Sequence, residues 1–474
     1  MTPPPASTAH GEWPSPITAA AVVAAANAPG EVHVVAGGAG TVVFWSESRP
    51  DEGGRVQLVR RTPDGTRVDL LPAGWSARTR VHEYGGGAWI PTADAVYFTS
   101  WDDQRLYRLA LAADGPVGEP VALTAVPEAH HARRYADLHV AGDRVFAVRE
   151  THPVGGGPAD VVNEIVSLPA DPPAAEPFEP AVLVSGPDFV MAPRVSPAGN
   201  RLAWIEWQHP SMPWDATTLR TAVLSPDGDR IVDPITVTGG PHVDESAVQP
   251  QWSADGTLVF ASDRTGWWNL YRFDPVAGAV ATVTVGEAER AEPQWVFAMS
   301  RAAELADGRI VAAGMADGVL GLRVFAPGDT EGVSIDTGFE DLSQIRAAGS
   351  VVYGIGAGFT AEAVVFALDL GAVDPSGSGH SGDATGPGDR SPAVEVLAPA
   401  RDLGLDPAWF SVGEHVTFPS GPMCACAQMR AASRNPASMP FPVARRRLCL
   451  SASQPGNRQH DSARHTAGRF HACH

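Results

Sequence analysis

Residues 249–275 read QPQWSADGTLVFASDRTGWWNLYRFDP. The segment divides into three predicted strands, one ending at Trp252, one over 257–262 and one over 267–273, with a fourth over 279–285. Asp255-Gly256 separates the first two strands and predicts a tight turn, because this dipeptide tolerates the positive φ that a hairpin requires. Four antiparallel strands in about 40 residues is the size of one β-propeller blade.

The same pattern recurs along the chain. Strand-rich blocks begin near seven positions, 42 to 58 residues apart: Thr41, Tyr84, Arg134, Met191, Gln249, Ala291 and Asp341. We therefore predict an all-β fold, a seven-bladed β-propeller with four antiparallel strands per blade, over residues 30–404, preceded by an N-terminal extension over 1–29. A β-helix would repeat at a much shorter period, and two β-sandwiches would not place the same turns in seven similar units.

The net charge of the chain argues against some classes of binding partner. The formal net charge is −20, and all 34 basic residues are arginine. Such an acidic chain is a poor ligand for the phosphate backbone of nucleic acids. No run approaches the roughly 18 apolar residues of a membrane span, and the N-terminus lacks the basic-then-apolar order of a signal peptide. We expect no nucleic acid, no membrane and a cytoplasmic location.

Composition changes sharply near residue 420. Residues 1–420 hold 26 Arg, 53 acidic residues and no cysteine, whereas residues 421–474 hold eight Arg, a single acid, Asp461, and all four cysteines. GC-rich codons read in a shifted frame yield Arg, Ala, Pro, Cys and His. We therefore interpret 421–474 as an aberrant, disordered tail from a frameshift and 405–420 as a linker.

The tail also invites a metal interpretation. Its possible ligands are Cys424, Cys426, Cys449, His460, His465, His471, Cys473 and His474. Zinc sites need paired ligands two to four residues apart on a scaffold that holds them, and Cys424-Ala425-Cys426 is too tight for such a pair. The frameshift interpretation is favoured over a zinc module or an unrelated basic extension, and we expect no metal and no cofactor.

Five segments, in order, carry a family resemblance. They are ARTRVHEYGGGAW (77–89), RYADLHV (134–140), VSGPDFVMAPRVSPAGNRLAWIEWQHPSMPWDATTL (184–219), PQWSADGTLVFASDRTGWWNLYR (250–272) and EPQWVFAMS (292–300). Together, over roughly residues 12–420, the chain resembles the N-terminal propeller of prolyl oligopeptidase family serine peptidases, and within them the bacterial dipeptidyl aminopeptidase/acylaminoacyl-peptidase type.

The resemblance implies half of a hydrolase. In that family the propeller covers the active site and admits only short peptides, while a following α/β-hydrolase domain carries a Ser-Asp-His triad with its serine in a Gly-x-Ser-x-Gly turn. No such motif occurs here; the nearest are Gly74-Trp75-Ser76-Ala77-Arg78 and Gly379-His380-Ser381-Gly382-Asp383. We expect the hydrolase domain to be absent, the chain to have no catalytic residues, and catalysis by the chain alone to fail.

Candidate substrate-binding residues lie within the predicted propeller. Arg149 and Glu150 stand at the end of a predicted strand, and His82 and Glu83 precede the Gly85-Gly86-Gly87 run. In related peptidases, propeller acids and arginines reach into the chamber, where a carboxylate suits an ammonium group and an arginine suits a carbonyl or carboxylate. Strand-end hydrogen bonding or an ion pair between blades is the competing interpretation.

Two further groups have structural interpretations that we prefer. Ser76, His82 and Glu83 are close in sequence, but sequence proximity does not make the nucleophile–base contact of a triad. The tryptophans 204, 207, 214, 267 and 268 are better explained by packing between blades or domains than by ligand stacking. The 207–214 loop, WQHPSMPW, would present an exposed apolar patch if it faces a domain that is absent.

Two other functions stay open. The first is a stand-alone propeller that binds peptides or proteins without catalysis. The second is a truncated product with an exposed domain interface. The nucleotide sequence beyond codon 420 discriminates between them, because a hydrolase motif in another frame would favour truncation.

Overall fold

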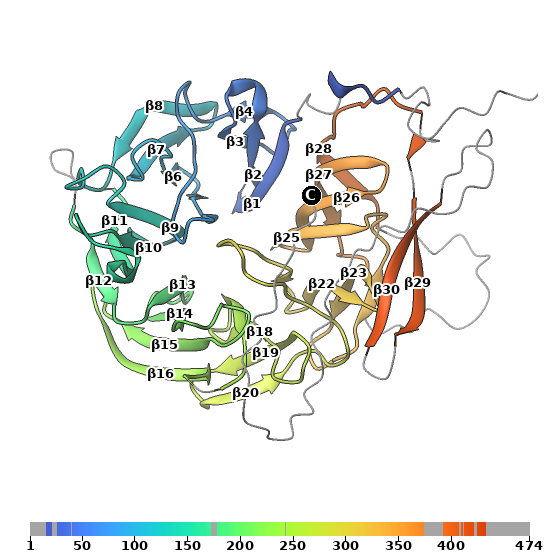
Figure 1. The fold of residues 1–474 in the computed structure, drawn as a ribbon. Coiled ribbons are helices and arrows are strands. Elements are labelled where there is room, and N and C mark those ends of the chain that lie inside the picture. Colours follow the sequence, from blue (N-terminus) through green and yellow to red (C-terminus); the bar gives the residue numbers. More distant parts are fainter. Residues whose placement is uncertain are drawn as a thin grey trace, which may run out of the picture.

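The computed structural model describes residues 16–20, 26–38, 40–171, 178–241, 243–373, 392–406, 409–410, 412–420 and 424–432. Seven four-stranded antiparallel sheets form a ring, in which the first blade lies beside the seventh (Figure 1). The predicted fold class is therefore confirmed. Consecutive strands pair within each sheet, so each blade is a local meander of the chain.

The first three blades take their strands from residues 28–184. Blade 1 holds β1 (Ala28–Gly37), β2 (Gly40–Arg49), β3 (Arg55–Arg61) and β4 (Arg67–Asp69). Blade 2 holds β5 (Trp89–Pro91), β6 (Ala95–Thr99), β7 (Leu106–Ala112) and β8 (Gly115–Ala122). Blade 3 holds β9 (Arg133–Ala141), β10 (Arg144–Thr151), β11 (Val162–Pro169) and β12 (Ala181–Val184). Two short 3₁₀ helices, η1 (Pro50–Glu52) and η2 (Pro158–Asp160), interrupt connections.

The remaining four blades span residues 189–398. Blade 4 holds β13 (Phe189–Val195), β14 (Arg201–Trp207), β15 (Thr218–Leu224) and β16 (Ile231–Gly239). Blade 5 holds β17 (Ala247–Trp252), β18 (Leu258–Ser262), β19 (Asn269–Asp274) and β20 (Ala279–Thr282). Blade 6 holds β21 (Ala302–Glu304), β22 (Ile310–Ala316), β23 (Val319–Phe325) and β24 (Val333–Ile335). Blade 7 holds β25 (Asp341–Ala348), β26 (Val351–Gly358), β27 (Ala361–Asp369) and β28 (Val394–Ala398).

The turn chemistry behaves as the sequence predicts. Gly256, in the predicted Asp-Gly turn, has φ of +84°, and Gly308, which follows Asp307, has φ of +85°. Glycine adopts such angles without the steric cost that a side chain brings. These turns fix the register of the hairpins around them, so the inner strands bury both faces between neighbouring blades.

The ring closes by side-chain packing and not by a shared sheet. Val32 and Trp45 of blade 1 pack in one buried cluster with Tyr353 and Val365 of blade 7. All four strands of blade 7 come from residues 341–398, so no strand is exchanged between the two ends of the ring. Burial of this apolar surface stabilises the closed ring by roughly 25 cal/mol per Å².

Two blade boundaries differ from prediction. The innermost strand of blade 1 is β1, which begins 13 residues before the predicted start at Thr41. In blade 6 the predicted strand at Ala291 is a loop, and the first strand, β21, begins at Ala302. The 291–300 segment is held instead by backbone hydrogen bonds to a distant part of the chain, including one from the Phe297 amide to the Gly85 carbonyl at 3.0 Å.

A further hairpin lies outside the seven blades. β29 (Val412–Ser420) pairs with β30 (Cys424–Ala432) in a two-stranded antiparallel sheet, so regular pairing crosses the predicted boundary at residue 420. The rest of the predicted tail, 421–423 and 433–474, lies outside the described residues, as does most of the Gly/Ser/Pro-rich insertion between β27 and β28.

Candidate functional site

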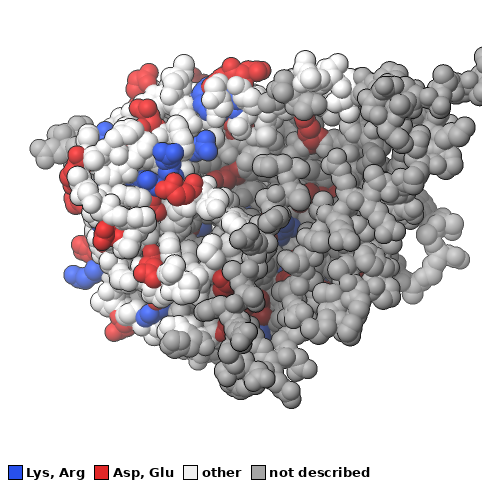
Figure 2. Space-filling view, in the orientation of Figure 1, with Lys and Arg blue, Asp and Glu red and all other residues white. Residues whose placement is uncertain are grey.

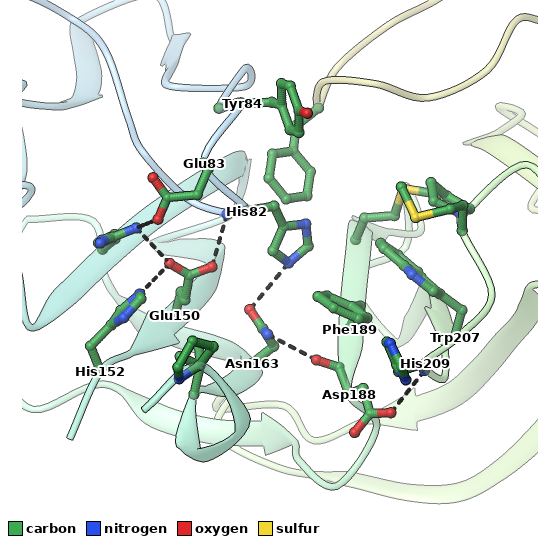
Figure 3. A pocket seen from close by; sticks show the side chains of 18 of the residues that line it. His82, Glu83, Tyr84, Glu150, His152, Asn163, Asp188, Phe189, Trp207 and His209 are labelled. Carbon is green, nitrogen blue, oxygen red and sulfur yellow. Dashed lines mark hydrogen bonds and ion pairs between the residues drawn. The ribbon is translucent and has the colours of Figure 1, made fainter. Parts of the chain in front are cut away.

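A cavity of about 1100 Å³ lies between blades 3 and 4 and the connections that join blade 1 to blade 2 and blade 5 to blade 6. Its walls come from the turn at 82–85, the ends of β9, β10 and β11, the start of β13, the 207–214 loop and the 294–297 loop. Figure 3 shows His82 between an acidic cluster on one side and aromatic side chains on the other. This volume slightly exceeds the range of about 300 to 1,000 Å³ that is typical of small-molecule sites.

The turn at 82–87 has an unusual backbone. His82 and Glu83 have φ of +53° and +65°, and Gly85, Gly86 and Gly87 are also left-handed. The His82 amide donates to Glu150 Oε2 at 2.8 Å, which locks this conformation. Left-handed non-glycine residues cost energy and tend to occur where a site requires them.

Glu150 is the buried centre of the acidic cluster. Its Oε1 accepts hydrogen bonds from Arg134 Nη1 at 3.0 Å and contacts His152 Nε2 at 2.6 Å (Figure 3). Arg134 Nη1 also donates to Glu83 Oε1 at 2.8 Å. One guanidinium thus serves two carboxylates, and the hydrogen bond from Arg134 lowers the pKa of Glu83. With Asp188 also lining the cavity, carboxylates outnumber arginines there.

The His82 ring is held as one tautomer. Asn163 Nδ2 donates to the Asp188 carbonyl at 2.8 Å, which leaves Asn163 Oδ1 to face His82 Nε2 at 3.1 Å. Burial lowers the pKa of His82, so the ring is neutral at pH 7. Nε2 therefore carries the proton, and Nδ1, which has no hydrogen-bond partner among the described residues, is an acceptor.

Three aromatic side chains surround that ring. Phe189 and Trp207 meet it edge-on, with centroid distances of 5.1 Å and 5.7 Å, and Phe297 is tilted at 4.9 Å. Because these rings cover the imidazole, His82 is desolvated although it lines a cavity.

The glycine run permits a close approach between two distant loops. Gly86 and Phe297 form a parallel backbone bridge, and the segments that carry them meet over the middle of the ring (Figure 1). A Cβ on Gly86 would lie 2.6 Å from the backbone N and O of Phe297, and one on Gly87 would lie 2.7 Å from Asp137 Cα. The Gly85-Gly86-Gly87 run is thus needed for close contact between backbone segments and not only to let the chain bend.

Aromatic side chains at the rim are exposed. Tyr84 is 65% exposed and Trp295 is 51% exposed. The Trp295 ring lies 4.4 Å from that of Trp214 and 5.8 Å from that of Tyr84. The sequence predicts a strand at Trp295, so its place in the cavity was missed, because that place depends on the contact of its loop with one about 200 residues earlier.

The structure brings three of the four predicted site residues together. His82, Glu83 and Glu150 line the cavity. Arg149 does not, because neighbouring residues of β10 point to opposite faces; its guanidinium pairs with Glu164 at 2.6 Å and Glu179 at 2.9 Å.

The remaining candidates have structural roles or lie elsewhere. Ser76 Oγ accepts the Val56 amide at 3.0 Å and does not line the cavity. Trp204, Trp207 and Trp268 are buried in one core cluster, as the packing interpretation predicts, and Trp214 packs at its edge; Trp207 and Trp214 also line the cavity. The 379–383 segment lies outside the described residues.

Neither a metal site nor a membrane helix is found within the described ranges. No group of three or more His, Cys, Asp or Glu side chains in those ranges is placed to hold a metal ion; the tail's possible ligands from Cys449 onward lie outside them. None of the helices in the same ranges has the length and hydrophobicity to cross a membrane.

Comparison with known proteins identifies similar structures. A puromycin-hydrolyzing peptidase from Mycobacterium tuberculosis matches with a TM-score of 0.76 and 32% identity, over 90% of this chain and 62% of that chain. Puromycin hydrolase matches with a TM-score of 0.75 and 32% identity, over 88% and 60%. A structure from a study of two prolyl endopeptidases matches at 12% identity with a TM-score of 0.60, over 86% and 55%, and supports the fold alone.

These matches concern part of each relative. The chain spans 60% to 62% of the length of the puromycin-hydrolysing structures. No protein-family model matches the chain, and neither does any curated protein. Together with the seven sequential four-stranded sheets, these matches show that the chain has the fold of the propeller portion of the puromycin-hydrolysing peptidases, a fold that the prolyl endopeptidase structure shares.

Proposed function

We propose that this propeller gates and binds substrate for a prolyl oligopeptidase-like serine peptidase and that its cavity receives short peptides. The observation that carries the proposal is the cavity itself, which combines an excess of carboxylates with aromatic walls on one face of the propeller. Peptides present the matching chemistry, a charged end and apolar side chains, to such a site.

The carboxylates favour the amino end of the peptide. Glu83 shares Arg134 with Glu150, and its side chain is 68% exposed, so it can receive an ammonium group without leaving a buried charge unpaired. Glu150 is enclosed and fully hydrogen-bonded, which suits it to positioning His82 and Arg134. His82 Nδ1 offers a neutral acceptor to a peptide N–H. Arg149 pairs with Glu164 and Glu179 on the opposite face of β10, so we assign it no contact with the peptide.

This preference bears on the two peptidase types that the sequence resembles. A free ammonium group, as in dipeptidyl aminopeptidase substrates, would gain from Glu83, whereas an acylated amine, as in acylaminoacyl-peptidase substrates, would not. We propose the aminopeptidase type.

Calorimetric titration with trialanine amide, free or N-acetylated, tests this assignment. We expect the free peptide to bind about tenfold more tightly, the range of a hydrogen bond to a charged group. The Glu83→Gln variant should lose most of this preference. Glu179→Gln, which removes another exposed arginine-paired carboxylate outside the cavity, should keep it. Equal binding of both peptides by the unmodified protein would contradict the assignment.

The reaction proposed for the complete enzyme is acyl transfer through a serine ester, without a metal or cofactor. The printed sequence contains no Gly-x-Ser-x-Gly motif, so we propose that these 474 residues bind peptides but do not hydrolyse them and that the family's hydrolase domain is the catalytic partner. Covalent labelling of a serine in the pure chain by a fluorophosphonate probe would overturn this part.

A stand-alone peptide- or protein-binding module is the second candidate, and the exposed rim aromatics favour it. The two candidates differ in the nucleotide sequence: a hydrolase motif in another frame beyond codon 420 supports the gating role. We retain as proposals the linker at 405–420, the out-of-frame origin of 421–474 and a cytoplasmic location, which the cysteine-free first 420 residues favour. Cell fractionation tests the location.

A further inference from the structure

We propose that Trp295, Trp214 and Tyr84 form an aromatic subsite that binds a bulky apolar side chain at the first or second residue of the peptide. The inference rests on the proposed function, because it assumes that a peptide occupies the cavity. It adds a specificity-determining group that recognises the side chain, separate from the carboxylates that recognise the amino end.

The exposure of Trp295 is the first argument. Trp204, Trp207 and Trp268 bury their rings in the core, whereas Trp295 leaves about half of its surface, 51%, exposed beside a cavity. Tryptophan is the largest side chain, so an exposed ring that lines a concave site offers a large apolar area to a ligand. Tyr84 adds a second exposed ring from a different part of the chain.

The ring geometry is the second argument. Trp214 and Trp295 are tilted by 41° with centroids 4.4 Å apart, and Tyr84 meets Trp295 at 69° and 5.8 Å. The three rings come from three separate loops, and all three line the same cavity as Glu83 and Glu150. An aromatic or branched aliphatic side chain gains both area burial and edge or face contacts on such a surface.

The position of Trp295 is fixed before any ligand arrives. Its loop is tied on one side by the Phe297–Gly85 hydrogen bond at 3.0 Å and the Gly86–Phe297 bridge. On the other side, Arg301 Nη2 donates to Glu292 Oε2 at 2.6 Å. A surface that is already ordered loses little conformational entropy on binding, so more of the contact energy appears as affinity.

The carboxylate of Glu83 determines which residue of the peptide lies next to the aromatic rings. Tyr84 follows Glu83 directly in the chain, so the aromatic surface begins one residue from the carboxylate proposed to hold the ammonium group. A residue of extended peptide spans about 3.3 Å. The side chain next to the rings therefore belongs to the first or second residue.

Calorimetric titration of the full chain with alanine tripeptide amides tests the subsite. The peptides carry Phe or Gly at position one or position two. For at least one of these positions we expect the Phe peptide to bind about tenfold more tightly than its Gly counterpart, the range for burying an aromatic side chain on an aromatic surface. Trp295→Ala should reduce that ratio to about twofold or less, whereas Trp295→Phe, which keeps a ring, should retain most of it.

Trp409→Ala is the matched control. Trp409 is 45% exposed and does not line the cavity, so its loss should leave the ratio unchanged. Thermal melting of each variant verifies folding. If the Phe and Gly peptides bind with one affinity, or if Trp295→Ala keeps the full ratio, the aromatic subsite is wrong while the proposed function stands. If none of the peptides binds, both proposals fail.

Discussion

Gly86 and Phe297 pair through a parallel backbone bridge that joins the connection between blades 1 and 2 to the connection between blades 5 and 6. The bridge brings His82, Tyr84 and Trp295 to one cavity, although Trp295 lies more than 200 positions after the other two. It exists only because neither Gly85 nor Gly86 carries a side chain: added Cβ atoms would lie 2.5 Å from the Thr79 carbonyl oxygen and 2.6 Å from Phe297 backbone atoms.

Gly86→Ala should therefore separate the two loops. The residue has φ of +89°, so alanine brings conformational strain and a clash with backbone that cannot move aside cheaply. We expect a loss of unfolding free energy of about 2 to 4 kcal/mol in urea denaturation. Gly74→Ala is the control, since Gly74 has φ of +88° with open space around it and should cost only about 1 kcal/mol. Equal losses in the two variants would show that the bridge contributes nothing to stability.

The sequence predicts the propeller because its information is local. Turn glycines and short apolar strands recur in each blade, and residues such as Gly256 adopt the expected left-handed angle whatever lies far away in the chain. The strand predicted at Ala291 is wrong for the opposite reason. The composition there is strand-like, but the segment forms a loop because it hydrogen-bonds to another loop some 200 residues earlier.

The candidate site is predictable only in part for the same reason. His82, Glu83 and Glu150 stand out as polar residues beside a glycine run and at a strand end, and they do line the cavity. Arg149 has the same local signal, but strand alternation turns it to the other face, and only the register of β10 reveals which of the two neighbours faces inward. Trp295 depends on the crossing of two loops, which no local pattern encodes.

Glu150→Gln should be far more damaging than Glu83→Gln. Both carboxylates contact the same atom of Arg134, but the Glu150 side chain is 5% exposed and that of Glu83 is 68% exposed. Removing the buried charge leaves Arg134 without its enclosed partner and weakens the acceptor of the His82 amide, so we expect a loss of about 2 to 4 kcal/mol. An exposed pair contributes less than about 1 kcal/mol. Chemical denaturation of both variants provides the comparison, and similar losses would contradict the assigned burial of Glu150.

Asp263 should destabilise the protein at neutral pH. Its Oδ1 accepts the Ser246 amide at 2.6 Å, but burial, aided by the charge of Glu245, raises the pKa of Asp263 to about 6. Between pH 4 and pH 6 the folded state holds the proton more tightly than the unfolded state, so stability falls as pH rises through this window. Asp263→Asn keeps an acceptor and removes the charge; we expect a melting temperature about 1 to 3 °C higher at pH 8 and no gain at pH 4.

Asp255→Asn, in the same blade, provides the opposite control. Hydrogen bonds from Thr257 lower the pKa of Asp255, so its ionised form stabilises the fold and the variant should melt lower at pH 8. A gain for Asp263→Asn that persists at pH 4 would mean that packing, and not ionisation, is responsible.

His139 should make the protein sensitive to mild acid. Burial and the nearby charge of Arg194 lower the pKa of His139 to about 3, so the folded state keeps the ring neutral while the unfolded state takes up a proton below about pH 6.5. Stability therefore falls as pH drops below 6.5, at no more than about 1.4 kcal/mol per pH unit for one group.

His139→Gln removes this titration, and urea midpoints between pH 7.5 and pH 5.0 should decline less steeply than in the unmodified protein. His33→Gln should act in the same direction, because burial also lowers the pKa of His33. Parallel declines in all three proteins would show that neither histidine is held neutral by the fold.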